Sequence, residues 1–201
     1  MLDGFMRRLV DPPLNAAAAM LVRGGVGADA VTAASVACGL ACAAAIAVGL
    51  DGFALLLLAL GRIGDGLDGA IARITRRTDR GGLADIVGDF MFYGAVPLAF
   101  ALRAPDANAL AATWLLFSFY VNGASFLAYA AIAAKRGLTT EVRGAKSIYF
   151  TAGLAEGTET ILVFVAMILL PGLFTPLALA FGVLCLVTAG ARVVIAWRTF
   201  D

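Results

Sequence analysis

The sequence contains no histidine, and this absence removes whole classes of enzyme chemistry. Its 201 residues include only three cysteines and 14% charged residues, whereas 62% are hydrophobic. Without histidine, neither a Ser-His-Asp nor a Cys-His catalytic arrangement is possible, so Asp, Glu, Lys, Arg, Tyr, Ser and Thr remain as candidates for chemistry. Cys38, Cys42 and Cys185 lie in apolar stretches with no complete zinc ligand set nearby. We therefore expect the three cysteines to be packing residues.

The hydrophobic excess indicates a membrane protein. Ordinary soluble domains are about 45–50% apolar, and a soluble fold of this size cannot hide so much apolar surface. The net charge of +1 gives no indication of nucleic acid binding. At the N-terminus, charges and a proline pair interrupt "MLDGFMRRLVDPP", so this segment lacks the apolar region of a cleavable signal peptide. We expect it to remain in the mature protein.

Six stretches are long and apolar enough to cross a bilayer, because a spanning helix needs about 20 mostly apolar residues. We expect an all-α integral membrane protein with a single domain over residues 1–201, made of an N-terminal surface segment (1–28) and a six-helix bundle (30–198). The predicted spans are Ala30–Leu50, Gly52–Ile74, Leu83–Leu102, Ala107–Ala134, Ser147–Leu170 and Gly172–Ala191.

The positive charges are distributed unequally about these spans. One side of the predicted bundle has Arg103, and Arg62 lies inside the second span. Because positive residues favour the cytoplasmic side, both termini are predicted to be cytoplasmic. The predicted cytoplasmic side holds Arg7, Arg8, Arg23, Arg73, Arg76, Arg77, Arg80, Lys135, Arg136, Arg143, Lys146, Arg192 and Arg198.

Ahead of the first span, "DGFMRRLV" and "LNAAAAMLVRGG" flank Pro12 and Pro13. Apolar residues alternate with arginines there, as in a helix that lies on the membrane surface. The alternative is a flexible basic tail.

Four aspartates, Asp65, Asp68, Asp85 and Asp89, lie in or beside the predicted spans. A carboxylate at the centre of a spanning helix costs about 2.5–3.5 kcal/mol on insertion scales. The members of each pair are three or four residues apart and share a helix face, and the loop between the pairs turns the chain back. Four convergent oxygen ligands without His or Cys indicate a hard-cation site, for Mg²⁺ or Mn²⁺.

The neighbouring residues suit a phosphate ligand. Gly64, Gly66, Gly69 and Ala72 leave the second span slim, so a bulky phosphate or another helix can approach it. Arg73 adds a positive fork suited to phosphate. The alternative is a buried salt-bridge network between the aspartates and Arg62, Arg73, Arg76 and Arg77.

The pattern Asp65-x-x-Asp68-Gly69-x-x-Ala72-Arg73, followed by Gly81-x-x-x-Asp85-x-x-x-Asp89, resembles the signature of the CDP-alcohol phosphotransferases, membrane enzymes that make phospholipid head-group linkages. The gap between Arg73 and Gly81 is one residue shorter than in the commoner form. The resemblance covers nearly the whole chain. It implies that an alcohol attacks a CDP-linked donor and that CMP leaves. Because the chain is short for an aminoalcohol transferase, we favour CDP-diacylglycerol as the donor.

The resemblance also implies roles for individual residues. Two divalent ions would be held by Asp65, Asp68 and Asp85, and Asp89 would be a further metal ligand or the general base. Thr32 either contacts the nucleotide or, like Asp29, caps the first span. The residues expected to bind the nucleotide and diphosphate are Asp68, Gly69, Ala72, Arg73, Thr78, Gly81 and Thr32.

Candidates for binding the acceptor alcohol lie around the fifth span. Arg143 and Lys146 suit a phosphorylated acceptor, and Glu156 and Glu159 are intramembrane acids, which are functional-site candidates. Topology-setting charges and pairing across helices are the alternatives. Asn122 and Ser125 either hydrogen-bond to ligand or join helices.

Two other functions compete with a lipid-linked transferase. One is an aminoalcohol transferase that uses soluble CDP-choline or CDP-ethanolamine, and the other is a divalent-cation transporter, although no internal repeat is visible. Family resemblance suggests a homodimer, for which Gly123, Ala124 and Ser125 offer a packing surface. The composition suits a bacterial plasma (inner) membrane, with the active site facing the cytoplasm.

Overall fold

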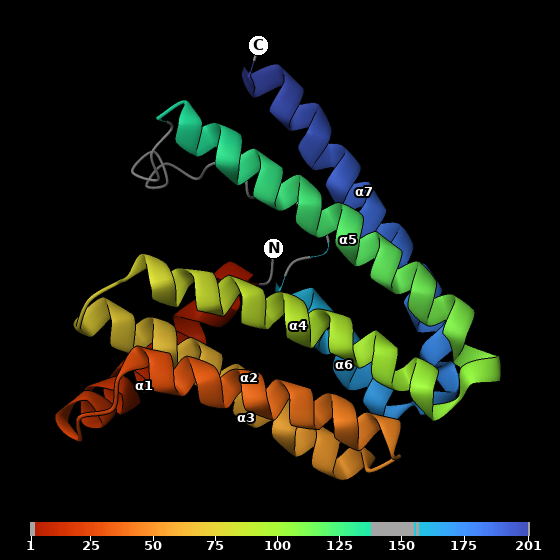
Figure 1. Ribbon diagram of the computed structural model, residues 1–201, viewed down its shortest axis with the longest axis horizontal. Helices are drawn as coiled ribbons and strands as arrows, with labels where there is room; N and C mark the ends of the chain where they lie inside the picture. The colour runs from red at the N-terminus through yellow and green to blue at the C-terminus, as the bar shows by residue number, and fades with distance from the viewer. Residues whose placement is uncertain (1–2, 138–154, 156, 201) are drawn as a thin grey trace.

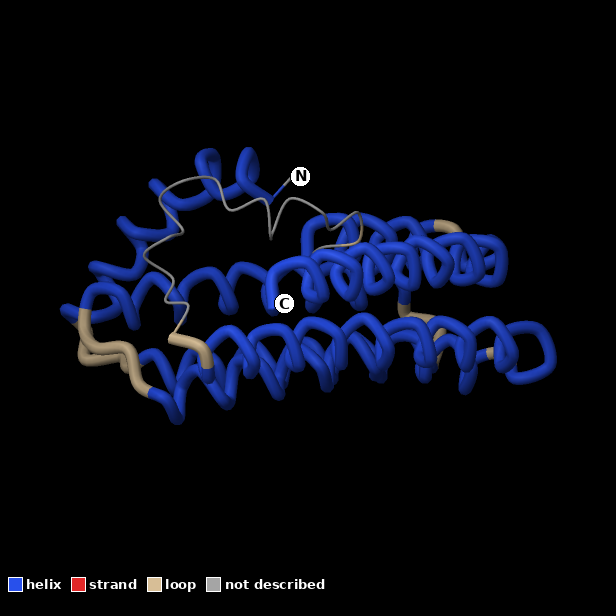
Figure 2. The backbone as a smooth tube through the Cα atoms, turned by 90° about the horizontal axis from the view of Figure 1, so that it is seen from above, coloured by secondary structure: helices blue, strands red, loops and turns tan. Residues whose placement is uncertain are grey.

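The computed structural model describes residues 3–137, 155 and 157–200, and within these ranges the chain forms helices and turns without strands (Figures 1 and 2). The all-α class predicted from the sequence is therefore confirmed. In chain order the elements are α1 (Asp3–Arg23), α2 (Ala28–Ala47), α3 (Asp51–Ile74), α4 (Asp79–Arg103), α5 (Pro105–Lys135), α6 (Gly157–Leu169), the short 3₁₀ helix η2 (Pro171–Leu173) and α7 (Phe174–Phe200).

Four helical stretches in the described part of the chain are long and apolar enough to cross a membrane, namely α2, α4, α5 and the stretch Pro171–Phe200 that includes α7. Helix α3 has 24 residues, but Arg62, Asp65 and Asp68 interrupt its apolar sequence. Helix α6 has 13 residues, and most of the predicted span N-terminal to it lies outside the described residues. Four of the six predicted spans are thus supported, and the other two stay predictions.

The helices form two groups. Helix α2 packs against both α3 and α4, and α1 packs against α3. Helices α5 and α7 lie together and diverge from α4 beyond the turn that joins α4 to α5 (Figure 1). Near that turn the rings of Phe100 and Phe174 stack with centroids 4.4 Å apart, and both rings are fully buried. Aromatic packing therefore joins the two groups where they meet.

Helix α1 continues through Pro12 and Pro13 as one helix. The flexible-tail alternative is therefore wrong, whereas the position of α1 on the membrane surface stays a prediction. Ala18 of α1 is buried against Ala70 and Ile71 of α3. Figure 2 shows α1, beside the N-terminus, outside the layers of long helices. Because α1 covers the end of α3 that carries Asp65 and Asp68, it forms one wall of that region.

Polar side chains join the helices at both ends of the bundle. Arg192 on α7 donates to the backbone and side-chain oxygens of Asn122, each at 3.0 Å, and to Ser125 at 2.7 Å on α5. The helix-joining interpretation of Asn122 and Ser125 is thus confirmed. At the other end, Arg103 of α4 donates from two nitrogens to both carboxylate oxygens of Asp51 on α3. This bidentate pair fixes the start of α3 against the end of α4.

Two groups of small residues serve packing within the chain. The expected homodimer surface is used internally, because a Cβ at Gly123 would collide with the ring of Phe90 on α4, and Ser125 accepts from Arg192. The homodimer itself stays a prediction. The cysteines are all free, with Cys42 and Cys185 buried and Cys38 half-buried, as expected of packing residues.

A pair of glycine substitutions tests the packing between α2 and α4. A Cβ at Gly39 on α2 would lie 2.9 Å from Cδ2 of the buried Phe92, whereas a Cβ at Gly190 on α7 would meet nothing within 4 Å. We expect Gly39→Ala to lower the free energy of unfolding by about 1–3 kcal/mol through overpacking. Gly190→Ala should leave it unchanged or raise it, since alanine is the better helix former. Thermal unfolding in detergent measures both, and equal midpoints for the two variants would contradict this packing.

Candidate active site

The C-terminal half of α3 and the N-terminal half of α4 bring three of the predicted metal ligands together. Asp65, Asp68 and Asp85 each offer a carboxylate oxygen, and these oxygens lie within 4.8 Å of one another. Asp65 and Asp68 share a face of α3 because they are one turn apart. The side chains of Asp65 and Asp85 are within hydrogen-bonding reach of each other. The three carboxylates therefore form a group that could hold one cation.

Asp68 gives independent evidence that this cluster suits a cation. Its side chain is only 5% exposed, and its Oδ2 atom is buried without a hydrogen-bond partner. Its carboxylate is within hydrogen-bonding reach of Thr32 on α2. A buried carboxylate oxygen without a donor is costly. Because Mg²⁺ and Mn²⁺ prefer oxygen ligands, the donor set fits such an ion.

Asp89, the fourth predicted ligand, has a different partner. Arg62 on α3 donates to Oδ1 of Asp89 at 2.9 Å and lies 3.6 Å from Oδ2 of Asp65. The guanidinium also lies over the ring of Phe92, with its carbon 4.6 Å from the ring centroid. The sequence spacing anticipates the pair of Arg62 with Asp65 one turn away. It gives no signal for Asp89, 27 positions away, because that contact depends on how α2, which packs against both helices, places α3 and α4.

The alternative interpretation is a salt-bridge network between the aspartates and four arginines. Among the contacts described for these arginines, only those of Arg62 are with the aspartates. Arg73 instead donates to Oδ1 of Asn15 on α1 at 3.3 Å, and Arg76 and Arg77 are exposed. Asp68 is buried away from these partners. The guanidinium groups therefore neutralise only part of the carboxylate charge.

Part of the glycine-rich face of α3 packs against neighbouring helices, and part of it is open. A Cβ at Gly64 would collide with the hydroxyl of Ser35 on α2, and a Cβ at Gly66 would lie 2.6 Å from Leu14 Cδ1 on α1. At Gly69 a Cβ would meet only Arg73, at 3.6 Å. Gly64 and Gly66 thus allow neighbouring helices to approach, and Gly69 is the position left for a ligand.

Three further candidates have local structural roles. Thr78 is the N-cap of α4, and its hydroxyl accepts the Gly81 N–H at 3.0 Å. Thr32 donates to the carbonyl of Ala28 at 3.1 Å. The expectation that Asp29 or Thr32 caps the first span is wrong, because the N-cap of α2 is Gly27 and has no side-chain cap. Thr32 instead lies next to Asp68, where a nucleotide contact remains compatible with its position.

Most of the candidates for binding the acceptor alcohol are residues that the structure does not describe. Arg143, Lys146 and Glu156 lie outside the described residues. Glu159 is half-buried in the first turn of α6, and α6 packs against α3.

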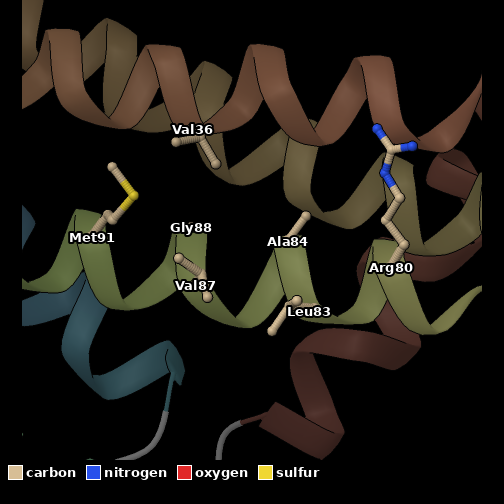
Figure 3. Close-up of a pocket in the computed structure, with 7 residues that line it drawn as sticks. All are labelled: Val36, Arg80, Leu83, Ala84, Val87, Gly88 and Met91. Carbon is tan, nitrogen blue, oxygen red and sulfur yellow. The ribbon is translucent and has the colours of Figure 1, made fainter.

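A shallow, open groove that the sequence does not predict lies along α4 beside Val36 of α2 (Figure 3). It has a volume of about 380 Å³ and an almost entirely apolar lining. Arg80, at the start of α4, is its charged residue and lies at one end of the row of side chains in Figure 3. The groove arises from the packing of two helices far apart in sequence. Its lining residues are Val36, Arg80, Leu83, Ala84, Val87, Gly88 and Met91.

Comparison with known proteins agrees with this geometry. A family model described as CDP-alcohol phosphatidyltransferase matches residues 26–197. The chain belongs to this family. It is 44% identical over 193 residues to "Inner membrane protein YnjF" of Escherichia coli (strain K12), a match that covers 96% of this chain and 94% of that protein. No solved structure matches the chain.

Membership of the CDP-alcohol phosphatidyltransferase family makes the chain a membrane-bound phosphotransferase of phospholipid synthesis. The transporter alternative is thereby set aside. The matched region contains the whole of α3 and α4, and therefore both the carboxylate cluster and the Arg62–Asp89 pair.

Stabilisation by Mg²⁺ tests the carboxylate cluster without any substrate. An ion that binds only the folded state adds about 2.7 kcal/mol of stability at a concentration of 100 times its Kd. We expect Mg²⁺ to raise the thermal midpoint of the wild type and to have little effect on Asp68→Asn. Asp106→Asn, at an exposed residue in the first turn of α5, is the matched control and should respond as the wild type does. An undiminished response of Asp68→Asn would show that Asp68 is not a ligand.

Proposed function

We propose that the chain transfers the phosphatidyl group of CDP-diacylglycerol to an alcohol and releases CMP, with Mg²⁺ or Mn²⁺ bound at Asp65, Asp68 and Asp85. The observation that carries this proposal is the set of three converging carboxylate oxygens, one of them from a residue that is only 5% exposed. A phosphotransferase needs positive charge beside a diphosphate, and an acidic cluster supplies it only by holding cations.

In the proposed reaction, the alcohol oxygen forms a bond to the β-phosphorus of the donor. The bond from that phosphorus to the CMP oxygen breaks, and its electron pair leaves with CMP. Asp89 accepts the proton of the alcohol as the general base. Its contact with Arg62 involves Oδ1, one of two carboxylate oxygens. A bound divalent ion would neutralise the charge of the diphosphate and of the departing phosphate.

The nucleotide and diphosphate are proposed to bind at the open part of α3. Gly69 has space beside its backbone, Ala72 is half-buried, and Arg73 is exposed one turn on. Thr32 of α2 lies on one side of this region, next to Asp68 of α3. Arg73 supplies a planar set of donors that matches phosphate oxygens. Thr78 and Gly81 contribute by shaping the start of α4.

A lipid-linked donor is favoured over soluble CDP-choline by the groove between α2 and α4. It is lined by apolar side chains, and Asp85 and Asp89 belong to the same helix as most of these. An acyl chain suits such a surface, whereas choline does not. Arg80 belongs to the groove and suits the phosphate region of a lipid.

The orientation of the site follows from its charges. The turn between α3 and α4 carries Arg76 and Arg77, and Arg80 lies at the start of α4; all three are exposed. Positive residues favour the cytoplasmic face. We therefore place the carboxylate cluster on the cytoplasmic side of a bacterial inner membrane, with both termini and six spans as the sequence predicts.

Release of CMP tests the reaction. Purified protein in lipid should release CMP from CDP-diacylglycerol when Mg²⁺ and a panel of alcohols, phosphorylated and not, are supplied. Asp89→Asn removes the proposed base and should lower kcat by at least 10²-fold, since general-base catalysis contributes about 10²–10⁴-fold. CMP is measured by chromatography.

A parallel reaction with CDP-choline and diacylglycerol separates the two donors. Release from the soluble donor alone would overturn the lipid-linked assignment. Full turnover by Asp89→Asn would remove Asp89 from the role of base. Asp106→Asn again serves as the matched control. It removes an exposed carboxylate in the first turn of α5, next to the end of α4 that lies away from the cluster.

A further inference from the structure

Arg62 is a cation built into the carboxylate cluster. Its side chain is 19% exposed, and it lies between Asp65 of its own helix and Asp89 of α4. The two distances, 3.6 Å and 2.9 Å, place the guanidinium in direct contact with Asp89 and close to Asp65. An ion in contact with both of these carboxylates would therefore lie close to the guanidinium.

The aromatic ring under Arg62 fixes its position. Phe92 is 1% exposed, and its ring packs edge-to-face on Phe164 of α6 with centroids 5.7 Å apart. Gly39 of α2 lies against the same ring. The ring is thus packed on several sides, and it contacts the guanidinium through a cation–π interaction. If Arg62 left this position, it would lose its contacts with both the ring of Phe92 and the carboxylate of Asp89.

The contacts of the four aspartates divide the cluster into two parts. Asp65, Asp68 and Asp85 converge within 4.8 Å of one another, and that group does not include Asp89. In the first part, Asp68 has a buried carboxylate oxygen without a hydrogen-bond partner. Asp89 has its charge matched by Arg62 in the second part. A divalent ion placed between Asp65 and Asp89 would meet a fixed positive charge at contact distance, and the two cations would repel each other.

Family resemblance predicts two ions among the four aspartates. We propose that this chain holds one divalent ion, at Asp65, Asp68 and Asp85, and that the guanidinium of Arg62 takes the place of a second ion beside Asp89. This inference rests on the proposed function, because it assumes that the aspartates bind the metal that the transferase uses. Arg62 is then a positioning residue, which holds the carboxylate of Asp89 in place. Asp89 is left as a base and not a ligand.

The number of bound Mn²⁺ ions tests this inference without any turnover. Protein in neutral phosphatidylcholine nanodiscs is dialysed against Mn²⁺ with no nucleotide, the metal is counted by atomic absorption, and electron paramagnetic resonance reports whether two ions are coupled. The wild type should bind one ion per chain and show the spectrum of an isolated Mn²⁺. Arg62→Met removes the charge at similar length and should bind two ions, with the spectrum of a coupled pair.

Two further variants make the test specific. Arg62→Lys keeps the positive charge and should still bind one ion, so it is the matched control for Arg62→Met. Asp89→Asn should also bind one ion, because Asp89 is not a ligand in the wild type. Adding Asp89→Asn to Arg62→Met should return the count from two ions to one, because Asp89 becomes a ligand only when Arg62 is gone.

The outcomes separate this inference from the proposed function. Two coupled ions in the wild type, lost in Asp68→Asn, would overturn the inference and leave the metal-dependent transferase standing. One ion in both the wild type and Arg62→Met would also overturn the inference, since the charge would not limit the count. No bound Mn²⁺ in the wild type would overturn both. The wild-type count decides the number of ions even if Arg62→Met fails to fold, and Arg62→Gln, which also removes the charge, then replaces it with the same expected count of two ions.

Discussion

Negative charge in an apolar environment must be matched by positive charge, and the site is organised around this requirement. Four aspartates lie on two neighbouring helices whose surroundings are largely apolar. A carboxylate in such surroundings is stable only when hydrogen bonds or cations replace the water it has lost. One aspartate, Asp89, is matched by an arginine of the same chain. The other three converge on one point, and one of them keeps a buried oxygen without a donor.

The packing of the helices supports this arrangement at several levels. Small residues let α2 and α1 approach α3 closely, at Gly64 and Gly66 respectively. The ion pair of Asp51 with Arg103 fixes α3 and α4 at the end far from the cluster. Helix position and carboxylate position are therefore set together, because the same two helices carry both. A positioned charge is more effective than a mobile one, since no reorganisation is needed when the reaction begins.

The sequence predicts the part of this site that depends on local geometry. The spacing of Asp65 with Asp68, and of Asp85 with Asp89, is enough to predict shared helix faces, and the all-α class follows from the long apolar stretches. Two features depend instead on tertiary packing. The contact between Arg62 and Asp89 joins residues 27 positions apart, and the groove beside Val36 and Val87 forms only where α2 meets α4. Thr78 is an intermediate case, because a threonine before an acidic first turn is also a common N-cap.

The different roles of the glycines on α3 also depend on tertiary packing. A run of small residues indicates that something approaches a helix, and it does not say whether that is a ligand or another helix. The three-dimensional packing assigns Gly64 and Gly66 to helix contacts and leaves Gly69 open. The difference between six predicted spans and four recognised ones has a related reason. A helix such as α3, which carries the charges of the site, loses the apolar signature by which spanning helices are recognised.

Anomalous diffraction from crystals grown in lipid with Mn²⁺ tests the central claim most directly, because it locates the cation itself. The account predicts an anomalous peak in contact with carboxylate oxygens of Asp65, Asp68 and Asp85, with Arg62 still against Asp89. A map without a peak at these oxygens, in which the three carboxylates are matched by arginine side chains alone, would contradict it.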